Sequence, residues 1–177
     1  MSRAFVREAD NAPELPLTRQ ASALPPGAKN YLTAAGAARL REELRHHVEL
    51  EPPALVAASE DAEAKRKLLA LDQRIQQLEE SLRSAEIVAL PGAHARDAAR
   101  FGATVTIRRS TGEEDVYRNV GVDEMDLERS WVSWASPIAR ALTNAHVAER
   151  VRFKFPAGEE NLEILKIEYE EPEEGGN

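Results

Sequence analysis

The sequence has no cysteine among its 177 residues, which excludes disulfides, thiolate metal sites and cysteine nucleophiles. Aromatic residues make up only 5% of it, and no apolar run is long enough to predict a membrane-spanning helix. The opening stretch, MSRAFVREAD, reaches an acidic residue at Glu8 without an apolar segment, which does not fit a signal peptide. We therefore expect a cytoplasmic protein that makes no contact with a membrane.

Motifs for nucleotide binding and for hydrolysis are also lacking. The sequence contains no G-x-x-x-x-G-K-[ST], no G-x-S-x-G and no G-x-G-x-x-G, so phosphate binding by a glycine-rich loop and hydrolysis by a serine triad are unsupported. The histidines do not have metal-site spacing, because His46 and His47 are adjacent on a predicted helix and cannot face one ion. We expect no catalytic residue, no metal and no cofactor.

Acidic residues outnumber basic ones, with 31 Asp plus Glu against 23 Lys plus Arg and a formal net charge of -8. A protein with this charge is repelled by a bare phosphate backbone. We therefore expect contact with nucleic acid to be indirect, through a protein partner. The hydrophobic content of 42% is enough for the core of one ordinary domain or of two small ones.

Two amphipathic helices are predicted within residues 29–90. In the first, Thr33 is suited to the N-cap, and Leu40, Leu44 and Val48 recur every four residues on one face. In the second, apolar residues follow a heptad pattern with steps of three and four: Leu68, Leu71, Ile75, Leu78, Leu82 and Ala85. Because such narrow stripes must be buried against each other, we expect an antiparallel coiled-coil hairpin.

The first arm of this hairpin contains Pro52 and Pro53, and an interior proline costs a helix about 3 kcal/mol or more. Either the arm kinks there, or it ends near Glu49 and a short helix restarts with proline in its first turn. The sequence does not separate these two possibilities.

The remaining segments complete an α+β protein. Residues 1–28 are rich in proline without sustained periodicity, which predicts a flexible extension. After a linker at 91–100, residues 101–170 alternate apolar and polar positions in about five strands, with a short helix before the fourth. This pattern predicts a small, curved antiparallel sheet packed on that helix. Residues 171–177 predict an acidic tail.

Three acidic residues stand close together in the stretch PALVAASEDAEAKRK, at residues 53–67: Glu60, Asp61 and Glu63. If Ser59 is the N-cap of the second helix, all three lie in its first turn, where the helix dipole stabilises negative charge. Lysines follow at the spacing of helical ion pairs, which would join Asp61 with Lys65 and Glu63 with Lys67. Two alternatives stay open: contact of these acids with a partner or its metal, and a role in hydrolysis.

The stretch SPIARAL predicts a short helix, with Ser136 as N-cap and Pro137 at the first helical position. Arg140 is the single cation among its apolar residues. Such an arrangement is typical of an interface anchor. A solvated arginine with no partner is the alternative, and the residues alone leave both open.

Six stretches of the sequence, taken in order, resemble the bacterial Gre-type transcription factors GreA and GreB over residues 29–169. They are NYLTAAGAARLREEL, DQRIQQLEESLRSAEIV, FGATVTI, VGVDEMD, SPIARAL and ILKIEY. The resemblance implies a coiled-coil hairpin followed by an FKBP-like C-terminal domain. It also implies that this domain docks at the rim of the secondary channel of RNA polymerase, while the hairpin enters the channel toward the active-site magnesium. Isomerase activity is not implied, because a fold does not transfer function.

The resemblance also implies a set of contact residues. The segment that matches the polymerase-contacting loop of the family comprises Ser136, Pro137, Ile138, Ala139, Arg140, Ala141 and Leu142. The implied partner is RNA polymerase core, bound by a monomer, with DNA and RNA contacted only through the polymerase. This favours the interface interpretation of Arg140.

At the hairpin tip, the chain departs from the cleaving members of the family. Those members carry Asp, then Ser two residues later and then Glu, and these help to hold a second Mg²⁺ that activates water. The matching stretch here has Ala57 in place of the first acid, followed by Ser59 and Glu60. Asp61 or Glu63 is a possible substitute, but Asp61 lies about 100° around the helix from Glu60.

The hairpin is also short for a cleaving member. The interval from Leu44 to Ile75 is 31 residues, and the resemblance implies that about a dozen are missing, which shortens the hairpin by about 10 Å. In this it resembles the non-cleaving, Rnk-like members. We therefore expect a regulator of elongation that binds polymerase without stimulating transcript cleavage. A cleavage-stimulating, anti-backtracking factor and an interaction module with another partner are the alternatives.

Overall fold

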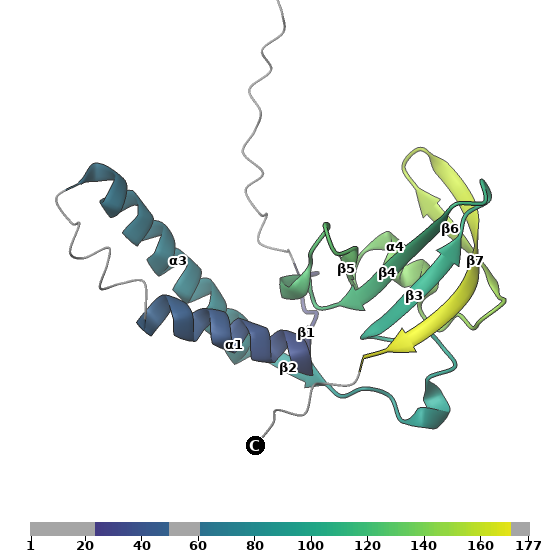
Figure 1. Ribbon diagram of the computed structural model, residues 1–177, viewed down its shortest axis with the longest axis horizontal. Coiled ribbons are helices and arrows are strands. Elements are labelled where there is room, and N and C mark those ends of the chain that lie inside the picture. Colours follow the sequence, from purple (N-terminus) through teal and green to yellow (C-terminus); the bar gives the residue numbers. More distant parts are fainter. Residues whose placement is uncertain (1–23, 50–60, 171–177) are drawn as a thin grey trace, which may run out of the picture.

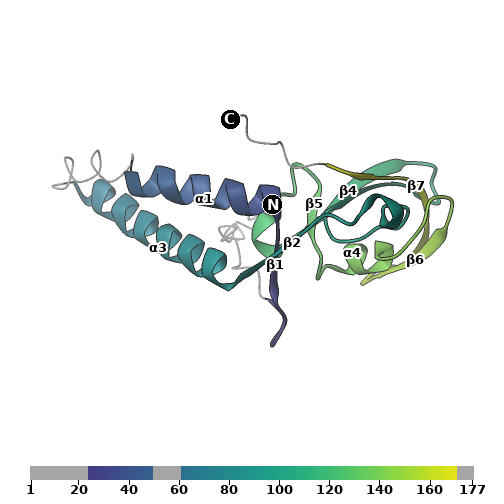
Figure 2. The same cartoon turned by 90° about the horizontal axis from the view of Figure 1, so that it is seen from below.

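A helical hairpin projects from a β-sheet domain in the computed structural model, which describes residues 24–49 and 61–170 (Figure 1). The N-terminal part consists of β1 (Asn30–Thr33), α1 (Ala34–Glu49), α3 (Ala62–Ser84) and β2 (Ala85–Val88). Figure 2 shows β1 and β2 at the base of the hairpin, between its helices and the sheet domain. None of the helices in these described segments is both long and apolar enough to cross a bilayer.

The two helices pack through the predicted apolar stripes. Thr33 is the N-cap, because its hydroxyl accepts a hydrogen bond from the Gly36 N–H at 2.9 Å. Leu40 and Leu78 are buried in one cluster, and every residue of the predicted heptad seam is buried or half-buried. An ion pair of 2.7 Å between Glu43 and Arg74 joins the two helices. The antiparallel hairpin is therefore confirmed.

Two residues of the predicted stripes were assigned wrongly. Val48 is 51% exposed, because it lies in the last turn of α1 rather than against α3. Ala85 does not continue the heptad helix, because α3 ends at Ser84 and the chain turns into β2. Pro52 and Pro53 lie outside the described residues, so the choice between a kink and a restart stays open.

The base of the hairpin contains a parallel two-stranded ribbon that was not predicted. β1 pairs with β2 in register, with Asn30 opposite Ala85 and Thr33 opposite Val88. Parallel pairing requires both strands to run in the same direction, which the hairpin provides by returning the chain to its starting point. The ribbon therefore joins the two ends of the hairpin.

The C-terminal domain is a five-stranded sheet with one short helix, as predicted. Its order is β5-β4-β3-β7-β6, and its elements are β3 (Ala103–Arg108), β4 (Glu114–Val120), β5 (Trp131–Ser133), α4 (Pro137–Leu142), β6 (Arg150–Phe155) and β7 (Gly158–Tyr169). All pairs are antiparallel except β4 with β5, which is parallel. The predicted antiparallel sheet is therefore confirmed, with one parallel pair at this edge, where β5 is only three residues long.

The core of this domain lies between α4 and the sheet. Ile107, Leu162 and Ile164 are fully buried there and share a cluster with Leu142 of α4. The segment predicted as a linker, 91–100, contains a 3-10 turn, η1 (Ala93–Ala95), and ends with Ala98 and Ala99 buried. The α+β fold class is confirmed, while the division into a hairpin at 29–90 and a domain at 101–170 stays a prediction.

Candidate functional site

The predicted contact segment forms α4, and its first turn is capped as the sequence indicates. The Ser136 hydroxyl accepts a hydrogen bond from the Ala139 N–H at 3.3 Å, and Pro137 occupies the first helical turn. At the other end, the Thr143 hydroxyl donates to the Ala139 carbonyl at 2.7 Å. Capping at both ends stabilises a helix of six residues, which is too short to be stable alone.

The seven residues of this segment divide between the core and the surface. Ala139 and Leu142 are 1% and 4% exposed, so both face the core and are closed to a partner. Pro137 and Arg140 are exposed, and Ser136, Ile138 and Ala141 are half-buried. Among the described residues, the Arg140 side chain has no hydrogen bond or ion pair. The surface offered by α4 is therefore centred on Pro137 and Arg140, and its binding role stays a prediction.

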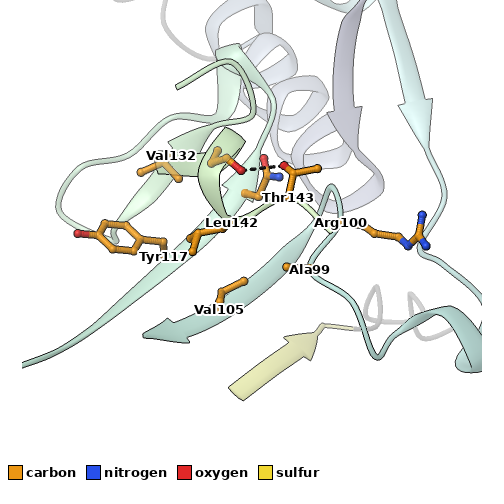
Figure 3. Close-up of a pocket in the computed structure, with 9 residues that line it drawn as sticks. Ala99, Arg100, Val105, Tyr117, Val132, Leu142 and Thr143 are labelled. Carbon is orange, nitrogen blue, oxygen red and sulfur yellow. Dashed lines mark hydrogen bonds between the residues drawn. The ribbon is translucent and has the colours of Figure 1, made fainter. Parts of the chain in front are cut away.

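A small cavity lies between α4 and the sheet (Figure 3). Its lining includes Val105, Tyr117 and Leu142, and its volume is about 10 Å³, which is the size of one water molecule. In Figure 3, the Arg100 side chain points away from the other lining residues. A cavity of this size does not admit an organic substrate, so it adds no support for an isomerase site.

Two acidic residues near the hairpin tip, Asp61 and Glu63, interact with residues of α3. Asp61, with φ −85 and ψ 135, is the N-cap, and its side chain accepts a hydrogen bond from the Glu63 N–H at 3.1 Å. The assignment of Ser59 as N-cap is therefore wrong, because helical geometry begins at Ala62, directly after Asp61. Ser59 and Glu60 lie outside the described residues.

Glu63 makes the ion pair that its spacing predicts. Its carboxylate lies 2.7 Å from the Lys67 ammonium, and this hydrogen-bonded cation lowers the pKa of Glu63. The other predicted pair, Asp61 with Lys65, is not formed. No group of His, Asp and Glu in the described segments has the geometry to hold a metal ion. A contact between the tip acids and a partner's metal stays a prediction.

A second set of interactions, which was not predicted, joins the hairpin to the sheet domain. Glu124 lies in the 3-10 turn η2 (Val122–Glu124) and is only 3% exposed. Its carboxylate accepts hydrogen bonds from the Thr33 N–H at 2.8 Å, the Thr33 hydroxyl at 2.5 Å and the Gly121 N–H at 3.0 Å. A residue of the sheet domain therefore binds Thr33, the N-cap of α1.

Neighbouring side chains extend this junction. The Asp123 carboxylate accepts hydrogen bonds from the Asn30 side-chain amide at 3.0 Å and from the Ser81 hydroxyl. The Tyr31 ring packs edge-on against the Trp134 ring, with 5.6 Å between centroids. One sequence signal was available: Gly36 stands inside a predicted helix, where an isolated glycine suggests a close approach by another group.

Comparison with known proteins identifies relatives along most of the chain. The family model described as "Transcription elongation factor, GreA/GreB, C-term" matches residues 94–169. Transcription elongation factor GreB of Neisseria meningitidis is 36% identical over 154 residues, which covers 80% of this chain and 94% of that protein. Transcription elongation factor GreA of Alkalilimnicola ehrlichii is 35% identical over 152 residues, covering 78% and 96%.

Among solved structures, the transcription elongation factor GreA/GreB from Nitrosomonas europaea is 20% identical to this chain. That comparison has a TM-score of 0.38 and covers 80% of this chain and 99% of the other.

Proposed function

Because the chain belongs to the GreA/GreB family of transcription elongation factors, we propose that it binds RNA polymerase core at the secondary channel and regulates elongation without stimulating transcript cleavage. The polymerase supplies the active site, and the factor itself carries no catalytic residue and needs no cofactor. It acts in the cytoplasm as a monomer and reaches nucleic acid only through the polymerase.

The observation that carries the non-cleaving part of this proposal is that Asp61 and Glu63 already have interaction partners within α3. Asp61 caps α3, and Glu63 is paired with Lys67. A carboxylate that is to hold a hard cation must be placed on that cation, since Mg²⁺ demands near-ideal octahedral geometry. The two acids that were candidate substitutes for the missing one therefore have other partners.

Hairpin length supports the same conclusion. α1 has 16 residues and α3 has 23, which correspond to about 24 Å and about 35 Å of helix. The resemblance implies that the cleaving members have longer arms. A hairpin of this length would occupy the channel without bringing its tip to the polymerase metal.

Docking is proposed to use the exposed side of α4. Arg140 is exposed and has no side-chain partner in the segments that the structure describes, so its charge is available to an acidic residue of another protein. Arginine is also enriched at the centres of interfaces. Pro137 beside it fixes the backbone of the first turn. The two together make a small, rigid contact surface.

Competition on purified polymerase core tests this proposal. The chain should displace a labelled cleaving Gre factor in a concentration-dependent way. Arg140→Ala should weaken the competition by about tenfold or more, the effect of losing an interface arginine. Arg108→Ala removes the same charge from β3 and should have little effect. Equal competition by both variants would contradict docking through α4, and an absence of competition would favour a different partner.

A cleavage-stimulating factor is the second candidate function. The observation that favours it is the exposure of Asp61 and Glu63. Both stand at the start of α3, and this end of α3 lies far from the sheet domain (Figure 1). In that case, these acids would exchange their local partners for the metal when the hairpin is bound.

A further inference from the structure

We propose that Glu124 is a positioning residue that fixes the direction of the hairpin relative to the sheet domain. Its effect on polymerase rests on the proposed function, whereas its effect on the geometry of the free protein does not. The residue lies in a turn of one part and binds Thr33, the helix N-cap of the other, so the two parts are held by the same carboxylate.

Both oxygens of this carboxylate are in use. One accepts from the N–H groups of Thr33 and Gly121, and the other accepts from the Thr33 hydroxyl. That hydroxyl in turn accepts from the Gly36 N–H at the first turn of α1. A buried charged acceptor is stable only when such donors surround it. The hairpin supplies two of the three donors, so its rotation would leave the carboxylate unsatisfied.

Two glycines provide the room for this contact. A methyl group at Gly36 would overlap the Glu124 carboxylate, and one at Gly121 would overlap the Tyr31 backbone carbonyl. Neither glycine has a positive φ, so neither is required by backbone conformation. Their absent side chains serve the close approach of the two parts.

Three further contacts hold the same orientation from other sides. Asp123, adjacent to Glu124, accepts hydrogen bonds from Asn30 of β1 and Ser81 of α3. From α1, the Arg39 guanidinium lies 4.6 Å from the centre of the Trp131 ring of β5, within the range of a cation–π contact. Contacts on both arms and on the ribbon oppose tilting in more than one direction.

The length of the hairpin makes this junction important for its tip. With an arm of about 35 Å, a tilt of about 10° at the base moves the far end by about 6 Å. A displacement far smaller than this is already enough to misplace a group in a channel or an active site and to reduce its effect there. A hairpin without the Glu124 contact would still dock through α4, but it would no longer point consistently into the channel.

The experiment is a distance measurement on the full chain. The sequence has no cysteine, so Gln77→Cys on α3 and Arg152→Cys on β6, both exposed, place two spin labels without side reactions. Double electron–electron resonance then gives the distribution of distances between the hairpin and the sheet. Circular dichroism of each variant shows whether its helices are intact.

Four variants separate positioning from stability. Glu124→Ala removes all three acceptor contacts, and Gly36→Ala displaces the carboxylate while favouring the helix, because alanine is a better helix former than glycine. Glu124→Gln keeps one oxygen for the two N–H groups and is the conservative rescue. Glu128→Ala removes an exposed acid from the following loop and is the matched control.

We expect a narrow distribution for the unmodified chain, for Glu124→Gln and for Glu128→Ala. Glu124→Ala and Gly36→Ala should raise the population of displaced hairpins about tenfold or more, because losing a hydrogen bond to a charged group removes much of the free energy that favours the fixed orientation. If Glu124→Ala fails to fold, Gly36→Ala decides. A narrow distribution in a folded Gly36→Ala protein would overturn the proposal.

A polymerase assay completes the test. Gly36→Ala should compete for polymerase core as well as the unmodified chain, while its effect on elongation rate falls. Loss of competition in this variant would contradict a role confined to hairpin direction. If the unmodified chain does not bind polymerase at all, the proposed function fails, and the distance distributions still decide the role of Glu124.

Discussion

Truncation of Leu78 should destabilise the hairpin more than any exposed substitution on the same helix. Leu78 is 1% exposed and packs in one cluster with Leu32 of β1 and Leu40 of α1. Leu→Ala changes at buried sites cost about 2 to 5 kcal/mol, depending on how far the surroundings collapse into the cavity. Half-buried Leu44 and Leu82 border the cluster and are free to relax. We therefore expect a loss of about 3 kcal/mol, a large share of the total stability of an ordinary domain.

The assay is urea denaturation followed by the helical circular dichroism signal. Leu69→Ala is the control, because Leu69 lies on the same helix but is 61% exposed, and its loss should be within about 0.5 kcal/mol. Leu78→Ala should lower the denaturation midpoint clearly below that of Leu69→Ala. Equal midpoints for the two variants would refute the packing of α3 against α1 and β1.

Three further outcomes follow from local geometry. Asp61→Ala should lower the free energy of unfolding of the hairpin by about 1 kcal/mol, whereas Asp61→Asn keeps the cap and should leave it unchanged. If both variants lose the same free energy of unfolding in urea denaturation, the capping role is contradicted. Gly112 has φ +92 in the β3–β4 turn, so Gly112→Ala should lower the free energy of unfolding by about 1 to 2 kcal/mol. Gly92→Ala should be nearly neutral. Equal urea denaturation midpoints for these two variants would contradict the strained turn. Tyr169 donates a hydrogen bond to the Ala98 carbonyl at 2.6 Å, and Tyr169→Phe should cost about 1 kcal/mol at neutral pH. Burial raises the pKa of Tyr169 above 10.0, so its contribution should be complete below pH 10 and lost as the pH rises through the raised pKa; a difference between Tyr and Phe that persists at higher pH would contradict this.

Local patterns were sufficient to predict most of the fold. The heptad seam from Leu68 to Leu82 predicts α3 because apolar residues at this spacing form one stripe on a helix, and that stripe is buried by packing against a second helix. The alternation in FGATVTI predicts β3 for the same kind of reason. Ser136 and Pro137 predict α4, because capping depends only on residues within one turn.

The junction between the two parts could not be predicted in the same way. Thr33 and Glu124 are 91 positions apart, and neither residue carries a local signal of the other. β1 and β2 are four residues each, too short for a periodicity to distinguish them from the ends of helices. Ala85 fits the heptad spacing, yet it pairs with Asn30 instead, because tertiary contacts outweigh the local pattern there.

Transcript cleavage in a backtracked elongation complex tests the central claim most directly. Polymerase core would be stalled on RNA labelled at its 3′ end and incubated with the chain, with a cleaving Gre factor as the positive control. We expect no release of short 3′ fragments above the rate of polymerase alone, together with inhibition of the cleavage that the positive control stimulates. Release of such fragments by the chain, and its disappearance when Glu60→Ala and Asp61→Ala are combined, would contradict the account.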